Sequence, residues 1–195
     1  MTNHGPTAFD ALMTQGMAAS QANDGAQAIE WFQKASAAEP AAGLPQFLLG
    51  AEFAALGQME VAEAAFANAT RLAPDFSMAR YQLGLLQFSS GRAAVALLTW
   101  QPLLALPATD PLPHFVSGFA ALAHDRFEDA LRHYEQGLAL NATNRALSDD
   151  IQKVIAGIKA LAPGATSGVA HPDEPSGEFD THVLLANYQQ HGRPH

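Results

Sequence analysis

Cysteine is absent from the sequence, which excludes disulfide bonds and thiolate metal sites. Basic residues are few, because 10 Lys and Arg stand against 19 Asp and Glu, for a net charge of -9. The chain therefore lacks the basic stripe that would replace the counterions of a nucleic acid. No run of 18 apolar residues occurs without a charge or a helix breaker, so we expect no membrane span. Residues 1–6 lack the basic start and apolar core of a signal peptide, so the expected location is the cytoplasm.

Motifs of catalysis and metal binding are also missing. The sequence has no His-Glu-x-x-His string, no Gly-x-Ser-x-Gly elbow and no glycine-rich phosphate loop. His114, His124 and His133 lack the partner four residues away that a helical zinc pair needs. We therefore expect a protein that is not an enzyme and that binds no metal or cofactor.

A spacing of 34 residues recurs along the chain. Four rows of residues share it, and the members of each row are similar in size or chemistry. They are Gly16, Gly50, Gly84 and Gly118; Ala28, Ala62, Ala96 and Ala130; Phe32, Phe66, Trp100 and Tyr134; and Ala35, Ala69, Leu103 and Gly137. Prolines at Pro40 and Pro74 close the first two units. A shared period of this length is typical of an array of helical repeats.

The order of these residues resembles the tetratricopeptide repeat, with four tandem units. The resemblance implies an all-α solenoid of four helix-turn-helix units, in which each unit buries its apolar face on the next. We expect a flexible N-terminus at 1–6 and repeat units at about 9–42, 43–76, 77–110 and 111–142, within 7–142. An apolar stripe at 143–162 predicts a capping helix, and the composition of 163–177 predicts a flexible linker before a tail at 178–195.

The turns and one irregularity can also be predicted. Gly25, Gly57, Gly91 and Asp125 fall between the two helices of each unit, where the turn requires a left-handed residue. Pro102 falls inside the second helix of the third unit and cannot donate to the carbonyl of Leu98. We therefore expect a kink at Pro102.

In tetratricopeptide proteins the first helix of each unit lines a concave groove, so the resemblance implies a peptide-binding row. The row contains Met13, Met17, Phe47, Leu48, Ala51, Tyr81, Gln82, Leu85, Phe88, Phe115, Phe119 and Leu122. None of them is charged, and the Lys, Asn and Arg residues with which one branch of the family clamps acidic chaperone tails are missing. The row predicts an apolar groove for an amphipathic or apolar segment. In the alternative, part of the row packs only between neighbouring units.

A last apolar segment lies in the tail. Phe179, Val183, Leu184 and Tyr188 predict a short helix with a broad apolar stripe. We expect this helix to lie in the groove, within one molecule or exchanged in a homodimer. The alternative is that it covers the outer face or the capping helix.

Together these features predict an adaptor or scaffold whose partner is a protein or peptide, with no nucleic acid and no membrane involved. The alternative is a cytoplasmic secretion chaperone, which would hold an apolar export substrate.

Overall fold

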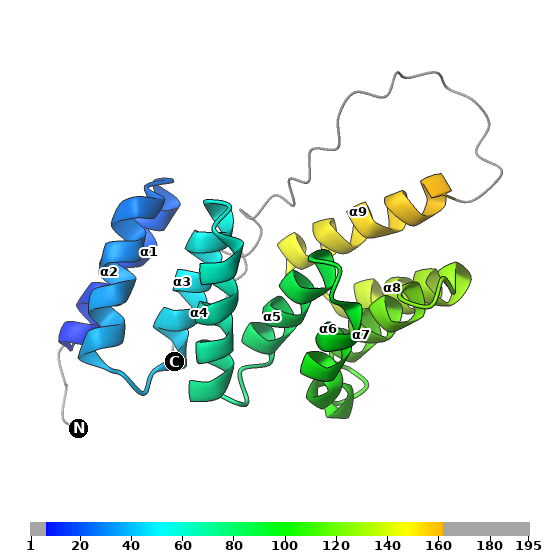
Figure 1. Ribbon diagram of the computed structural model, residues 1–195, viewed down its shortest axis with the longest axis horizontal. Helices are drawn as coiled ribbons and strands as arrows, with labels where there is room; N and C mark the ends of the chain where they lie inside the picture. Colours follow the sequence, from blue (N-terminus) through cyan, green and yellow to red (C-terminus); the bar gives the residue numbers. More distant parts are fainter. Residues whose placement is uncertain (1–6, 162–195) are drawn as a thin grey trace, which may run out of the picture. The chain divides into compact units, whose positions relative to one another are not determined.

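The computed structural model describes residues 7–161, and within that range the chain forms helices, turns and loops without a strand. The chain divides into two compact units, with the boundary after Gln101. The first unit contains α1 (Ala8–Gln21), α2 (Gly25–Ala38), α3 (Gly43–Ala55), α4 (Met59–Leu72), α5 (Ser77–Ser89) and α6 (Ala93–Trp100). A 3₁₀ helix, η1 (Gln101–Ala105), follows at the boundary. The second unit contains α7 (Pro111–Leu122), α8 (Phe127–Leu140) and α9 (Arg145–Leu161) (Figure 1).

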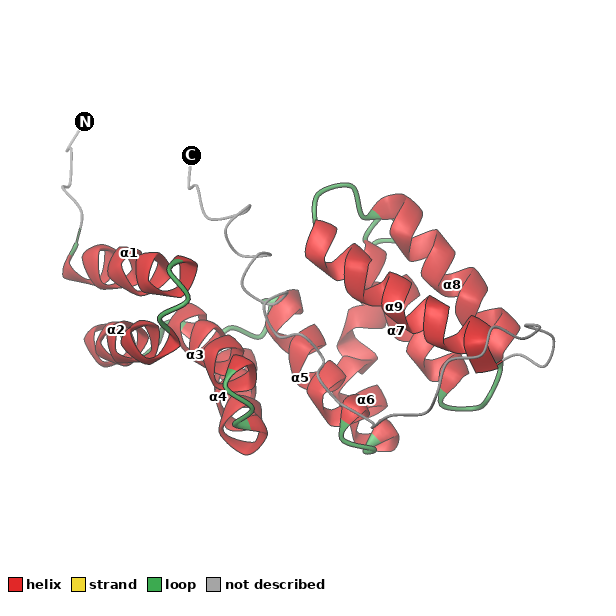
Figure 2. Cartoon of the chain, turned by 90° about the horizontal axis from the view of Figure 1, so that it is seen from above, coloured by secondary structure: helices red, strands yellow, loops and turns green. Residues whose placement is uncertain are grey.

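The helices pack in consecutive pairs, as the repeat predicts. In the first unit α1 packs on α2, α3 on α4 and α5 on α6, while α2 also contacts α3 and α4 contacts α5. In the second unit α7 packs on α8, and α9 follows on α8 (Figures 1 and 2). The prediction of an all-helical fold built from helix pairs is confirmed within residues 7–161.

Side chains at several helix starts satisfy backbone N–H groups that have no partner inside the helix. At α1, the Thr7 hydroxyl accepts from the Asp10 N–H at 3.1 Å, and the Asp10 carboxylate accepts from the Thr7 N–H at 2.9 Å. This reciprocal pair is a capping box. Asp110 caps α7 by accepting from the Leu112 N–H at 2.9 Å, with Pro111 in the first turn.

Pro102 ends an α-helix rather than bending one. The α6 helix stops at Trp100, and the chain continues as the tighter helix η1. Because Pro102 has no N–H, the carbonyl of Leu98 accepts instead from the N–H of Gln101, a 3₁₀-type bond. The expected disruption is at the predicted place, but its form is a change of helix type.

The turn residue of the first pair is Asn23, and the prediction of Gly25 for that position is wrong. Asn23 has a φ of 58°, matching Gly57 at 73°, Gly91 at 76° and Asp125 at 55°. Gly25 is instead the first residue of α2. Asn adopts the left-handed conformation more easily than other residues with a side chain, so this turn forms without glycine.

The core of each pair is an aromatic ring set against a glycine. Phe32, Phe66, Trp100 and Tyr134 are all buried. A Cβ added to Gly16 would lie 2.5 Å from the Phe32 ring, and one added to Gly50 would lie 2.7 Å from the Phe66 ring. Gly84 approaches Trp100 and Gly118 approaches Tyr134 in the same way. The 34-residue period therefore reflects one contact that recurs in every pair.

Several predictions concern residues outside the described range. The flexible N-terminus at 1–6, the linker at 163–177 and the tail helix with Phe179, Val183, Leu184 and Tyr188 all lie there. Within residues 7–161, no helix is both long and apolar enough to cross a membrane.

Candidate functional site

The first helix of each pair carries the predicted groove row, and charge is scarce on these helices. In the first unit α1, α3 and α5 contain one charged residue each, namely Asp10, Glu52 and Arg80. No Asp, Glu, Lys or Arg occurs in α7 of the second unit. We call the side of α1, α3 and α5 that carries Met17, Leu48, Gln82, Leu85 and Phe88 the inner face.

The structure places most of the predicted groove row below the surface. Eight of its twelve members are buried: Met13, Phe47, Leu48, Ala51, Tyr81, Gln82, Phe115 and Phe119. The other four, Met17, Leu85, Phe88 and Leu122, are half-buried, and none is fully exposed. That all twelve residues bind a peptide stays a prediction.

In the first unit the buried aromatic members pack against other rings. The Phe47 ring centroid lies 5.8 Å from that of Phe66 and 4.8 Å from that of Phe76. Tyr81 stacks on Trp100 at 5.9 Å, and its carbonyl accepts a hydrogen bond of 2.9 Å from the Trp100 indole N–H. Such contacts are typical of core aromatics, so these two residues support the inner face from below.

In the second unit, Phe115 and Phe119 are likewise core residues. A Cβ added to Gly137 on α8 would collide with the Phe115 ring. Phe119 meets Tyr134 edge to face, with ring centroids 5.3 Å apart. Of the predicted row on α7, Leu122 alone keeps a partly exposed side chain.

Half-buried apolar side chains form the accessible part of the inner face. Met17, Leu85 and Phe88 belong to the predicted row, and Phe88 stacks on Trp100 at 5.9 Å. Leu44 and Met78 were missed by the sequence reasoning, yet they are also half-buried. Both lie six residues before their repeat glycine, one turn before Phe47 and Tyr81. Extending the same helical periodicity by one turn would have found them.

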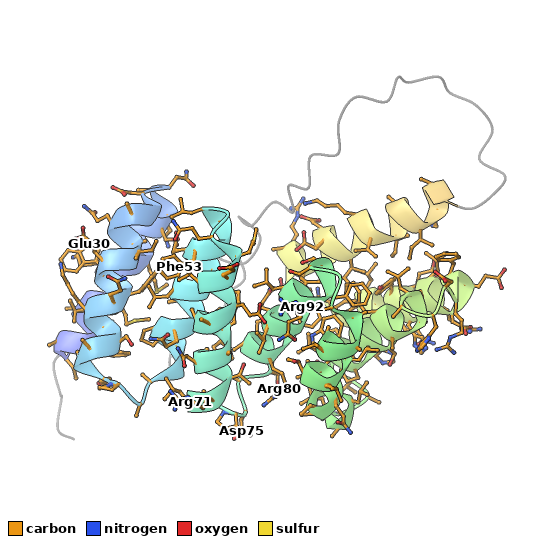
Figure 3. All side chains as sticks on the ribbon, viewed as in Figure 1. Glu30, Phe53, Arg71, Asp75, Arg80 and Arg92 are labelled. Carbon is orange, nitrogen blue, oxygen red and sulfur yellow. The ribbon has the colours of Figure 1, made fainter. Side chains whose placement is uncertain are left out.

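A polar network connects the second and third helix pairs. Arg92, labelled in Figure 3, lies at the start of α6. It donates to both carboxylate oxygens of Glu63 on α4, at 2.9 and 2.6 Å. Gln87 on α5 donates to Glu63 at 3.3 Å and accepts from the Thr99 hydroxyl at 2.7 Å. The hydrogen bonds from Arg92 hold the pKa of Glu63 below its ordinary value. The network joins α4, α5 and α6.

Two further polar side chains lie buried or half-buried in the second unit, Tyr134 and His133. The Tyr134 hydroxyl has no hydrogen-bond partner among the described residues, and burial raises its pKa, so it stays protonated at neutral pH. Burial also lowers the pKa of His133. Within residues 7–161, no group of three His, Asp or Glu side chains could hold a metal ion.

Comparisons with known proteins identify the fold. No protein-family model matches the sequence, and no curated protein is significantly similar to it. Solved structures do match. The tetratricopeptide protein TTC0263 of Thermus thermophilus has a TM-score of 0.61 at 20% identity, over 80% of this chain and 84% of that one.

Two other matches extend over similar lengths. MamA of Desulfovibrio magneticus RS-1, residues 41 to the end, gives a TM-score of 0.59 at 16% identity, over 80% of this chain and 94% of that one. YrrB, described as a tetratricopeptide protein with an unusual peptide-binding site, gives 0.55 at 17% identity, over 80% and 86%. The likenesses confirm the predicted tetratricopeptide-repeat fold.

Proposed function

We propose that this tetratricopeptide-repeat chain is a non-enzymatic protein-interaction adaptor whose inner face binds an apolar or amphipathic peptide segment. The observation that carries the proposal is the uncharged row of half-buried side chains on α1, α3 and α5. Met17, Leu85 and Phe88 are partly open to solvent, and Leu44 and Met78 extend the row by one turn.

Burial of this row supplies the binding energy. Each Å² of apolar surface removed from water contributes about 25 cal/mol, and a segment with several apolar side chains covers several hundred Å². Met17 and Met78 have flexible, polarizable side chains that fit partners of different shape. Phe88 rests on the buried Trp100 ring, so a partner meets a firm surface at that point.

The charge pattern indicates which partners fit. An acidic tail would need basic residues on the inner face, and Arg80 is the one basic residue of α1, α3 and α5. An amphipathic helix instead places an apolar stripe on such a face and leaves its polar side in water. A tetratricopeptide structure described as having a peptide-binding site, YrrB, supports the same kind of role.

The test compares two leucines of the third helix pair. Leu85 on α5 belongs to the inner face, whereas Leu98 on α6 is 72% exposed elsewhere on the same pair. A panel of fluorescent amphipathic helical peptides is titrated with the Leu85→Asp and Leu98→Asp variants, and binding is followed by anisotropy. We expect Leu85→Asp to weaken the best peptide at least ~10-fold, the cost of placing a carboxylate at an apolar contact, and Leu98→Asp to leave it unchanged.

Two kinds of result would count against the proposed function. Equal loss in both variants, or no binding by any peptide, contradicts peptide recognition at the inner face. If the protein instead prevents aggregation of unfolded apolar substrates without selecting among the peptides, the secretion-chaperone alternative is favoured. Thermal melts of both variants verify that each remains folded.

A further inference from the structure

One side of α4 carries a regular stripe of exposed residues. These residues stand at positions i, i+4, i+7 and i+11, so they share one face of the helix. They are Glu60, Ala64, Ala67 and Arg71, and we call them the outer stripe. The buried Phe66 of the same helix points instead toward Gly50 of α3. The outer stripe therefore begins with an acid, ends with a base and has small apolar side chains between them.

The two charges of the outer stripe are not satisfied by other side chains within residues 7–161. Neither Glu60 nor Arg71 takes part in the ion pairs of that range. They are separated by about 16 Å along the helix axis, which is too far for them to pair with each other. On α2, by contrast, Glu30 has Lys34 one turn away, at 3.9 Å. Within the described range, α4 thus presents an acid and a base at a fixed separation without local partners.

Large apolar side chains border the outer stripe. Val61 on α4 is 46% exposed, and on α6 Val95 and Leu98 are 44% and 72% exposed. The hydrogen bonds from Arg92 to Glu63 hold the start of α6 against α4, so these side chains belong to one surface of the first unit. Exposed apolar side chains that gather in this way favour contact with another protein surface.

We infer that the outer stripe joins two copies of this chain in an antiparallel dimer with two-fold symmetry. An axis across the middle of α4 sets Glu60 of each copy opposite Arg71 of the other, and Ala64 opposite Ala67. The opposite charges fix the register twice, and the alanines allow the two helices to approach closely. A parallel arrangement would set acid against acid and base against base. The charge pattern is its own complement only in the antiparallel arrangement, which is why a second copy fits it.

The dimer adds to the proposed function without depending on it. The inner face belongs to α1, α3 and α5, whereas the outer stripe lies on α4, so the two surfaces share no residue. Each dimer carries two inner faces. If these faces bind peptide segments as proposed, a partner with two such segments binds more tightly than its single segments do.

The test measures the mass of the full-length chain by sedimentation velocity, from about 1 to 200 μM. We expect a species of twice the 20.6 kDa chain mass at the upper concentrations. Glu60→Arg places like charges opposite each other at both ends of the stripe, so the dimer Kd should rise at least ~10-fold, and Arg71→Glu should do the same. Combining both substitutions restores opposite charges with exchanged roles. The Kd of the double variant should return to within about 3-fold of the native value.

Glu128→Arg is the matched control, because Glu128 occupies the equivalent repeat position in the first turn of α8 and is also exposed. It should leave the dimer Kd unchanged, whereas Val61→Asp at the apolar border should raise it. Thermal melts verify that each variant is folded.

Three results would overturn the inference. They are a native chain that stays monomeric at every concentration, single variants that keep the native Kd, and a double variant that dimerises no better than the single ones. Lower melting temperatures with unchanged dimerisation would mean that Glu60 and Arg71 interact only with the dipole of their own helix. Peptide binding does not enter this measurement, so the dimer and the proposed function can each fail without the other.

Discussion

Replacing Gly50 by alanine tests the repeated glycine–aromatic contact most directly. The new Cβ would lie 2.7, 2.8 and 2.9 Å from three atoms of the Phe66 ring, whereas carbon atoms in contact normally stand about 3.5–4.0 Å apart. Phe66 is buried, so its ring must displace other core atoms to make room. We therefore expect Gly50→Ala to destabilise the protein.

Two opposing effects determine how much Gly50→Ala changes the free energy of unfolding. Overpacking of a core costs about 1–3 kcal/mol, while alanine in a helix interior is about 1 kcal/mol better than glycine. Contacts below 3.0 Å place Gly50→Ala in the upper part of the overpacking range, at about 2–3 kcal/mol, so the net loss is about 1–2 kcal/mol. This loss lowers Tm by about 2–8 °C for a domain of this size. The assay is thermal unfolding followed by far-UV circular dichroism.

Gly157 on α9 supplies a matched control, because a Cβ added there meets nothing within 4 Å. Gly157→Ala keeps the helix-propensity gain without the clash, so its Tm should rise by about 1–4 °C. In a Phe66→Leu background, Gly50→Ala should cost less than in the native chain. If Gly50→Ala is stabilised as much as Gly157→Ala, the close contact is refuted.

Three further predictions concern stability. Trp100→Phe removes the donor to the Tyr81 carbonyl, so the free energy of unfolding measured in urea should fall by about 1–3 kcal/mol. Trp31 is half-buried and serves as the control; an equal loss in Trp31→Phe would contradict the buried hydrogen bond. Asn23→Ala should have a free energy of unfolding about 1 kcal/mol lower than Asn23→Gly, because a φ of 58° is unfavourable for alanine. Equal melting temperatures of the two variants would count against this turn conformation. The pKa of Glu63 is lowered in the folded state by Arg92, so its contribution is present above the ordinary value of 4.5 and is lost as pH falls through the folded pKa. The stability difference between the native protein and Glu63→Gln should therefore shrink between pH 7 and pH 3, and a constant difference would exclude the linkage.

The sequence by itself determined which residues recur in every repeat. The 34-residue period aligns Gly50 with the other repeat glycines and Phe66 with the other aromatic residues, because a repeat array needs the same packing in every unit. The place where α6 ends could likewise be predicted, since Pro102 removes a backbone donor in any helix. Both inferences depend on local covalent chemistry or on the repeat itself.

The turn at Asn23 shows where residue identity misleads. Residue type favours Gly25 because glycine adopts positive φ at little cost, but the structure places that conformation two residues earlier. The spacing from Gly57 and Gly91 back to Asn23 is the same 34 residues. The 34-residue spacing predicts the turn position better than residue type does, because the helices on either side determine where the turn lies.

Only the tertiary structure decided which side chains of the predicted groove are accessible. Periodicity places Phe47 and Leu85 on the same side of their helices, yet Phe47 is buried beneath Phe66 and Phe76 while Leu85 is half-buried. Helical spacing specifies the direction in which a side chain points. Its exposure depends on residues far away in sequence that pack over it, and these come together only when the repeats fold.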